Sequence, residues 1–196
     1  MQTFHVELTF TEPLLGTVPK NKTIYSDYIA NRQADLDVAD EEIETVPIDP
    51  EKGVTGFHED EDGPFLYDYI LKGFFKDAAS MLRRVGGTHS SKLRAYKKVI
   101  DGLVFIQPRR IHLQLAGPME TLERPLRAQT AQGERVSLAK SYIAPVGTQI
   151  AFDVILMNST LEPLLREWLD YGLMRGLGQW RNAGYGRFTY DIQADD

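Results

Sequence analysis

The stretch GLGQWRNAGYGRF, residues 176–188, places backbone freedom beside side chains that bind anions. Its two glycine pairs are Gly176/Gly178 and Gly184/Gly186. The segment between the pairs includes Trp180, Arg181 and Asn182, and Arg187 follows the second pair. Glycine supplies positive φ angles and lets the backbone approach a bulky or charged ligand, and converging backbone amides form anion-binding concavities. We therefore interpret the stretch as a candidate anion-binding loop.

A helix is predicted before this loop and a strand after it. Ser159 and Glu162 form a capping-box pattern, and Pro163 suits a first helical turn. Apolar or small residues then recur at helical spacing: Leu161, Leu164, Leu165, Trp168, Leu169 and Gly172. After the loop, residues 187–192 alternate as a strand does, with Phe188 on the inner face. The loop is thus expected to join the last helix to the last strand.

Three further strands are predicted from alternating apolar residues. Residues 3–10 alternate strictly, and residues 148–157 form a second clear case. Residues 103–115 have the pattern of one strand that is interrupted by Pro108. All three are expected to bury one face and leave the other polar.

One more helix is predicted over residues 63–84, with Pro64 in its first turn and Gly86 and Gly87 after its end. Residues 87–101 are basic and are expected to be irregular. The element order β-α-β-β-α-β predicts an α+β fold of the ferredoxin-like, or RRM-like, type. Its antiparallel sheet has the strand order 4-1-3-2, with both helices on one face.

Residues 13–62 form an acidic insertion after the first strand. Within it, residues 35–62 contain twelve acidic groups and one lysine, a net charge of −11. The whole chain carries −6, so the remaining residues carry +5. We expect residues 31–62 to be a long mobile loop and residues 35–60 to be dispensable for folding, because few apolar residues are present. A helix over residues 21–32 is left open.

The loop, its position and the strand order together resemble the RAMP superfamily, the RNA-binding proteins of CRISPR–Cas systems. That family's loop runs small-hydrophobic-glycine, a short spacer, then glycine-aromatic-glycine before a strand, as GLG and GYG do here. Residues 117–147 are similar to the thumb-like hairpin that folds over guide RNA in the backbone-forming subunits. The resemblance covers residues 1–12, 63–115 and 145–196, and it implies a single RAMP-like domain over residues 1–196.

The resemblance implies that guide-RNA phosphates lie along the first helix and its neighbouring loops. Residues 70–98 carry eight basic residues against Asp77 alone, and Lys72, Lys76 and Arg83 lie within ~40° of one another on a helix. The expected RNA-binding residues are Lys72, Lys76, Arg83, Arg84, Lys92, Lys97, Lys98, Arg124, Arg127, Lys140, Gly178, Trp180, Arg181, Asn182, Gly184, Gly186 and Arg187. The alternatives are a solvated helix face, a core position for Trp180 and an ordinary helix-to-strand turn.

The open face of the sheet is expected to be polar rather than aromatic. Its predicted residues are His5, Glu7, Arg110, His112, Gln114, Asp153, Thr189 and Asp191. Sheets that read RNA bases carry stacking aromatics on this face. RNA is therefore expected on the helix and loop side.

We assign no catalytic residue, cofactor or metal, and a binding protein is favoured over an enzyme. The histidines are His5, His58, His89 and His112. On the first and second strands of the sheet, His5 and His112 would lie about 9–10 Å apart at ordinary strand spacing, which is too far to share a metal. The acidic run at residues 58–63 offers cation ligands, but a solvated loop is the favoured reading.

Composition excludes several protein classes. The chain has no cysteine, so it forms no disulfide and no thiolate site. No apolar run approaches the ~18 residues of a membrane span, and the first residues do not resemble a secretory signal. A cytoplasmic protein without a membrane partner is expected.

These observations favour a guide-RNA-binding backbone subunit of a CRISPR-like ribonucleoprotein that serves antiviral defence. Its expected partners are guide RNA, target RNA or DNA, further copies of itself and other Cas-like subunits. Two alternatives stay open. One is an RNA-processing endoribonuclease of the same superfamily. The other is a protein of host or viral origin that mimics such a subunit and inhibits an effector complex.

Overall fold

A four-stranded antiparallel sheet forms the centre of the molecule in the computed structural model, which describes residues 1–20, 54–130 and 133–195. The sheet order is β12-β1-β11-β7. Its strands are β1 (Gln2–Phe10), β7 (Val104–Gln107), β11 (Gln149–Leu156) and β12 (Phe188–Ala194). In chain order this is 4-1-3-2, so the predicted ferredoxin-like topology is confirmed.

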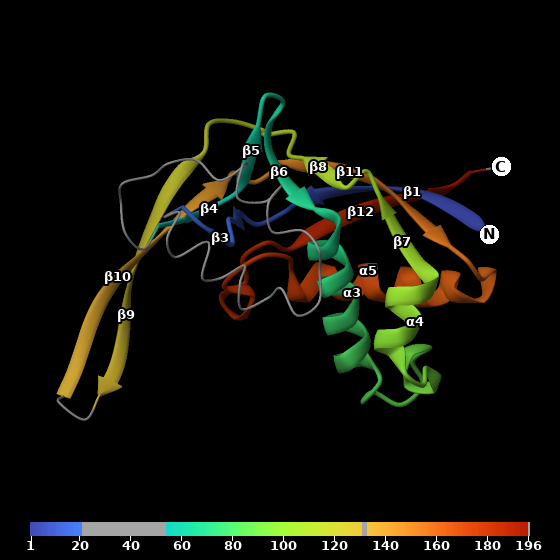
Figure 1. Ribbon diagram of the computed structural model, residues 1–196. Coiled ribbons are helices and arrows are strands. Elements are labelled where there is room, and N and C mark those ends of the chain that lie inside the picture. The colour runs from blue at the N-terminus through green and yellow to red at the C-terminus, as the bar shows by residue number, and fades with distance from the viewer. Residues whose placement is uncertain (21–53, 131–132, 196) are drawn as a thin grey trace.

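Two helices, α3 (Asp68–Leu82) and α5 (Glu162–Arg175), cover one face of this sheet (Figure 1). Their apolar faces meet the inward side chains of β1, which are fully buried: Phe4, Val6, Leu8 and Phe10. Phe75 of α3 packs on Trp168 of α5 with ring centroids 5.6 Å apart. The packed helices fix the position of the loop that follows α5.

The start of the first helix and the course of the second strand differ from the prediction. Pro64 lies in a strand, β6 (Gly63–Tyr67), rather than in a first helical turn, and α3 begins at Asp68. The chain leaves the main sheet at Pro108, which has no N–H to continue a ladder. It then forms β8 (Arg110–His112), which pairs with β6 in a second sheet of order β5-β6-β8.

Part of the acidic insertion is ordered, contrary to the expected mobile loop. Residues 54–60 form β4 (Val54–Gly56) and β5 (His58–Asp60), between which Phe57 is only 1% exposed. Burial of Phe57 and His58 argues against the expectation that residues 35–60 are dispensable for folding. Residues 21–53, and with them the helix considered over residues 21–32, lie outside the described residues.

The predicted hairpin over residues 117–147 is confirmed. It consists of β9 (Glu120–Thr130) and β10 (Gly133–Ala144), and it extends away from the helices in Figure 1. Its base is held in a third sheet that also contains β4 and two short strands, β2 (Leu14–Leu15) and β3 (Val18–Pro19). Side chains of residues 125–138 lie outside the described part of the structure.

Residues 87–101 were expected to be irregular, but they contain regular structure. They form a 3-10 turn, η1 (Ser90–Lys92), and most of a helix, α4 (Tyr96–Leu103). Ala95 adopts the left-handed conformation, with φ 50°, and so turns the chain into α4. The predicted capping box is also wrong. A 3-10 turn, η2 (Ser159–Leu161), precedes α5, and the side chain of Asn158 caps it by accepting from the amide of Thr160. Among the described residues, no helix has the length and apolar character needed to cross a membrane.

Candidate nucleic-acid interface

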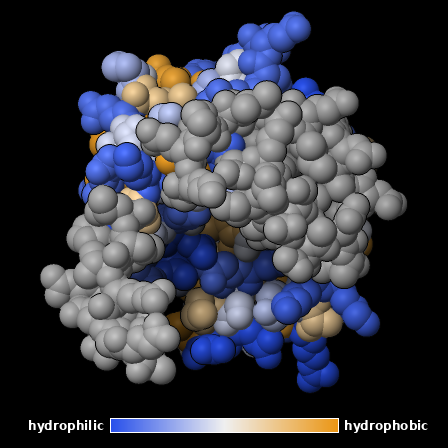
Figure 2. Space-filling model, turned by 60° about the vertical axis from the view of Figure 1, so that its left-hand side comes forward, coloured by the Kyte–Doolittle hydropathy of each residue, from blue (hydrophilic) through white to orange (hydrophobic). Residues whose placement is uncertain are grey.

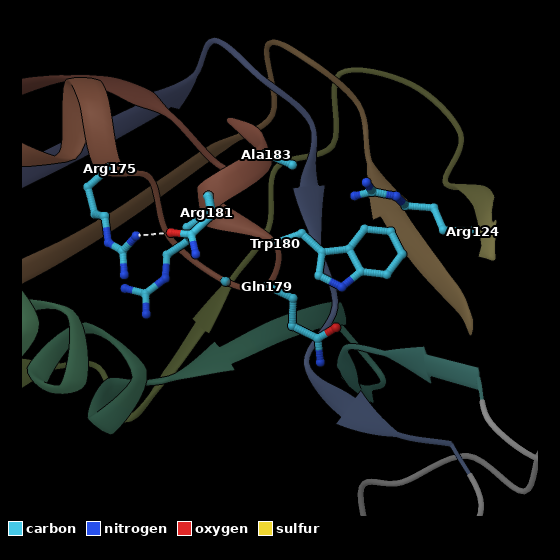
Figure 3. Close-up of a pocket in the computed structure, with 8 residues that line it drawn as sticks. Arg124, Arg175, Gln179, Trp180, Arg181 and Ala183 are labelled. Carbon is cyan, nitrogen blue, oxygen red and sulfur yellow. Dashed lines mark hydrogen bonds between the residues drawn. The ribbon is translucent and has the colours of Figure 1, made fainter. Parts of the chain in front are cut away.

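The glycine-rich loop forms one side of an open groove with a volume of about 570 Å³. We call it the arginine groove; its lining residues are Arg124, Arg175, Gly178, Gln179, Trp180, Arg181, Asn182 and Ala183. The residues come from β9, from the end of α5 and from the loop, where a 3-10 turn, η3 (Arg181–Ala183), presents three of them. In Figure 3 two arginines occupy one side of the groove, and Trp180 with Arg124 the other.

Two of the loop glycines are needed because the ends of the loop touch each other. Leu177 donates its amide to Gly186 O at 2.8 Å. A Cβ atom on Gly186 would lie 1.9 Å from Leu177 O, and one on Gly176 would lie 2.4 Å from Tyr185 O. Gly186, at φ 70°, therefore holds backbone against backbone within the protein.

Gly184 differs from its neighbours, because a Cβ atom there would meet only the guanidinium of Arg187, at 3.6 Å or more. Gly178 lies against the first strands, with its Cβ position 2.9 Å from Leu15 O. Arg187 is half-buried, and its Nε has no hydrogen-bond partner among the described residues. Of the loop glycines predicted to approach a ligand, Gly184 is thus the one whose Cβ position meets a side chain and no backbone atom.

A pair of arginines shares one carboxylate on the wall of the groove. Arg175 Nε and Arg181 Nη1 donate to Asp77 Oδ2 of α3 at 3.1 and 2.8 Å. Arg175 Nη1 also donates to Asn182 Oδ1 at 2.5 Å. Two guanidinium charges against one carboxylate leave this wall positive, with donors in the planar arrangement that suits phosphate.

Trp180 is not a core residue. Its backbone is left-handed, at φ 53° and ψ 32°, which is rare for a bulky side chain. The Arg124 guanidinium lies over its indole ring, with Cζ 4.3 Å from the ring centroid, and Tyr185 meets it edge-on at 6.2 Å. Trp180 remains partly exposed, so the ring forms a wall of the groove.

Two residues of the predicted cationic stripe on α3, Lys72 and Lys76, are partly covered and contact α4, whereas the third, Arg83, is exposed. Lys76 Nζ forms an ion pair with Asp101 Oδ1 of α4 at 2.5 Å, and Lys72 Nζ donates to Asp101 O at 3.5 Å. Burial lowers the pKa of the Lys72 ammonium although Asp101 and Asp68 oppose the shift. Ala79, which completes the row, is fully buried. The sequence did not show that α4 packs on this side.

Exposed cations instead gather at the C-terminal end of α3 and around α4. We call this the α4 basic surface; its residues are Arg83, Arg84, Lys92, Arg94, Lys97 and Lys98, all exposed. The chain has no acidic residue between Asp77 and Asp101, and both of these carboxylates already pair with other cations. None of the six forms an ion pair with a residue that the structure describes, and Arg83 stacks on Tyr96 at 5.4 Å.

Two cations of the hairpin complete the predicted set. Lys140 Nζ pairs with Glu123 Oε1 at 2.9 Å across the two strands. Arg127 lies on β9, but its side chain is outside the described residues. The face seen in Figure 2, turned so that the hairpin side comes forward, is hollowed and largely hydrophilic between the grey segments.

The histidines do not form a shared centre. His5 Nδ1 lies 2.9 Å from Asp153 Oδ1 on the open sheet face, where both side chains are about half exposed. His112 and Arg110 lie on β8 and not on the main sheet, which corrects the predicted sheet face. Phe105 of β7, 40% exposed, also breaks the expected absence of aromatics there, with Lys72 Nζ 4.9 Å from its ring centroid.

Asp60, Asp62 and His112 bring ligand-type atoms within 4.8 Å of one another at the β5–β6 turn. Burial opposes ionisation of Asp60, but hydrogen bonds from His112 and the Asp62 amide, with the charge of Arg110, hold its pKa below the ordinary value. Arg110 Nη1 lies 3.4 Å from Asp60 Oδ2, so this carboxylate already has a cationic neighbour. His89 lies apart, in a hollow with four charged residues of α5.

Sequence reasoning missed three lining residues of the arginine groove, Arg175, Gln179 and Ala183, and it also missed the role of Asp77, which accepts from two of the arginines. Arg175 occupies the last turn of α5, and Gln179 precedes Trp180. Asp77 was read only as the single acid in a basic segment. The position of Arg175 directly before Gly176 was a signal that could have identified it, because helix C-termini favour cations. The contact with Asp77 joins residues far apart in the chain and has no sequence signal.

Comparison with known proteins supports the fold assignment. No protein-family model matches the sequence, and no curated protein matches it. A chain in the structure of the Type III-B Cmr-beta complex bound to cognate target RNA aligns with a TM-score of 0.56 at 14% identity. The two chains share a fold. The alignment covers 98% of this chain and 60% of that one. A chain of a Type IV-B CRISPR complex aligns at 12% identity, with a TM-score of 0.48 over 97% of this chain and 90% of that one.

Proposed function

We propose that this chain is a guide-RNA-binding backbone subunit of a CRISPR-like ribonucleoprotein and a member of the RAMP superfamily. The observation that carries the proposal is the arginine groove, which three arginines and a tryptophan line together with the glycine-rich loop. The fold shared with a chain of the Cmr-beta complex supports it. As one RAMP-like domain, the chain assembles along RNA with further copies or other subunits.

RNA phosphates bind first at the pair formed by Arg175 and Arg181. A phosphate oxygen accepts hydrogen bonds from guanidinium N–H groups, as Asp77 does from these two arginines. Bidentate guanidinium contacts of this kind are strong and directional. Asn182 and the open backbone at Gly184 add polar contacts on the same side. Arg187, beside Gly184, is in reach of the same strand.

The strand then continues over the α4 basic surface. Asp77 lies five residues before Leu82, the last residue of α3, or about 7–8 Å along the helix axis, and Arg84 follows two residues later. One strand therefore reaches both regions. Lys97 and Lys98 lie in the first turn of α4, where the helix dipole disfavours cations and no acidic residue compensates. Bound phosphates would relieve this unfavourable placement.

Filter binding of single-stranded RNA at two salt concentrations tests the proposal. The groove variant Arg124→Ala with Arg181→Ala lowers the net charge by two, and so does the control Thr189→Glu with Gln193→Glu on the exposed sheet face. We expect the groove variant to bind RNA at least tenfold more weakly and the control to keep near-normal affinity. If both variants lost RNA affinity equally, net charge alone would explain the loss, and the arginine groove would not be the RNA-binding site.

Two outcomes would favour the other functions. Cleavage of a repeat-type RNA hairpin without added metal would indicate an endoribonuclease. Purified protein with a protein-like 260/280 nm absorbance ratio that binds an effector complex but no RNA would indicate an inhibitor.

A further inference from the structure

Trp180 has a position that packing does not explain. It is a bulky residue in the left-handed conformation, which costs about 1–3 kcal/mol when other contacts enforce it. Trp168, by contrast, is fully buried and donates its Nε1 to Ser90 Oγ. Trp180 makes no such core contact and instead turns one face of its indole into the arginine groove (Figure 3).

The face of Trp180 is covered by a planar group that can move. The Arg124 guanidinium lies 4.3 Å from the ring centroid, and it reaches the groove from β9 on a long side chain. Guanidinium groups and nucleobases both stack on aromatic faces. Arg124 therefore occupies the place that a stacked base would take.

Opposite this stack, the groove supplies a separate site for phosphate. Arg175 and Arg181 lie on the other side in Figure 3, and Asp77 holds both. A groove with a cationic wall and an aromatic wall matches a nucleotide, which has an anionic end and a planar end. A duplex does not fit this arrangement, because its bases are already stacked.

We propose that the arginine groove captures one unpaired nucleobase between the Trp180 indole and the Arg124 guanidinium. The inference rests on the proposed RNA-binding function and names how that site recognises its ligand. The guanidinium moves outward to about 7 Å from the indole, twice a carbon contact distance, and stacks on the outer face of the base. Recognition through the π face is tolerant of base identity and selects single strands.

Intrinsic fluorescence offers a direct test, because the chain has two tryptophans and Trp168 is fully buried. We compare oligouridine with a strand of equal length in which every base is absent, and with the same RNA in duplex form. Oligouridine is expected to quench the Trp180 emission. The abasic strand and the duplex are expected to bind without quenching. The same quenching measurement with a DNA oligothymidine shows whether the ribose contributes to binding.

Two variants of Trp180 separate stacking from folding. Trp180→Asn removes the ring and places a residue that tolerates the left-handed conformation. It should bind oligouridine about tenfold more weakly, about 1.4 kcal/mol, and bind the abasic strand unchanged. Trp180→Phe keeps a stacking ring and should retain most of the affinity. Arg124→Ala should weaken oligouridine binding several-fold.

The outcomes distinguish this inference from the proposed function. Quenching by the abasic strand, or an unchanged preference of Trp180→Asn for oligouridine over the abasic strand, would overturn base capture. Tighter binding by Arg124→Ala would overturn the sandwich, since the guanidinium would then only compete with the base. If wild-type protein binds neither strand, the proposed RNA-binding function itself fails.

Discussion

Asp77 sets the charge of the arginine groove at the scale of a single residue. Its Oδ2 accepts from both Arg175 and Arg181, so it occupies donors that a phosphate needs. Asp77→Asn keeps the shape and removes the negative charge. We expect RNA to bind several-fold more tightly in filter binding, and urea unfolding to show a loss of about 1–2 kcal/mol. Weaker RNA binding would contradict competition and assign Asp77 to positioning the arginines.

Two glycines of the same loop should respond very differently to a methyl group. Gly186→Ala places Cβ 1.9 Å from Leu177 O, and backbone must move to accept it. Gly184→Ala places Cβ in ordinary van der Waals contact with the Arg187 guanidinium, at 3.6 Å or more, and carries mainly the strain of φ 92°. Chemical denaturation should show a loss of about 3 kcal/mol or more for Gly186→Ala and about 1 kcal/mol for Gly184→Ala. Similar losses for both would contradict the different packing of the two positions.

This difference changes how the loop can be tested for RNA contact. A double variant at Gly184 and Gly186 would change folding and RNA contact together, because a Cβ on Gly186 meets backbone within the protein. Only Gly184→Ala isolates an effect on RNA.

At the scale of elements, the ordered part of the insertion is expected to be essential for stability. Phe57 is 1% exposed and lies between β4 and β5. Phe57→Ala should lower the free energy of unfolding by about 3–5 kcal/mol, measured by thermal or urea denaturation. Thr55→Ala, which removes a part-buried hydrogen bond to Ser141 on the neighbouring strand, serves as a milder control. Near-normal stability of Phe57→Ala would restore the idea of a dispensable loop.

His58 should make this small sheet sensitive to acid. Burial, with the charges of Lys20 and Arg110, lowers its pKa from 6.5 to about 3. The folded state therefore binds fewer protons than the unfolded chain between these values. Stability is complete above pH 6.5 and falls as the pH drops towards 3, by at most about 1.4 kcal/mol per pH unit from this group. His58→Gln should flatten the dependence in urea titrations at several pH values; an unchanged slope would contradict the assignment.

Elements with a strong local pattern were predictable, and elements defined by distant partners were not. The alternation of β1 and β11 and the apolar face of α5 are local signals, and the sheet order expected from the element order is confirmed. The hairpin was expected from the family resemblance. β5 and β6 are short, and their burial depends on β8, which follows α3 in the chain. α4 was not predicted because its first turn is polar and it buries a single residue, Ile100, which is too few for a recognisable apolar face.

The candidate site divides in the same way. The loop and its arginine, Arg181, were found because glycine spacing and charge are visible in the sequence. The groove itself depends on Asp77 and on Arg124 meeting Trp180, contacts between α3, β9 and the loop. The contacts of Lys72 and Lys76 with Asp101 of α4 were not predicted, because helical periodicity identifies a face but not what packs against it.

The whole molecule separates its charges, with a net −11 over residues 35–62 and six exposed cations on the α4 basic surface. Arg84→Ala, Lys97→Ala and Lys98→Ala together should weaken binding of long RNA and lower the slope of log affinity against log salt by about 2. The matched control is Gln107→Glu, Thr189→Glu and Gln193→Glu, which changes net charge equally on the exposed sheet face. An unchanged slope in the first variant would remove this surface from the RNA path.

The hairpin contributes Arg124 to the arginine groove near its base, and its tip lies far from the groove. Arg124 pairs with Ala139 in the β9–β10 ladder, and the last pair before the tip is Thr130 with Gly133. Six residues at ~3.4 Å each place the tip about 20 Å beyond Arg124. A tilt of about 10° at Arg124 therefore moves the tip by about 3–4 Å, given that same rise per residue. A rearrangement of about an ångström beside Trp180 would therefore displace the hairpin tip by several ångströms, given that same rise per residue. A neighbouring molecule bound at the tip would be moved with it.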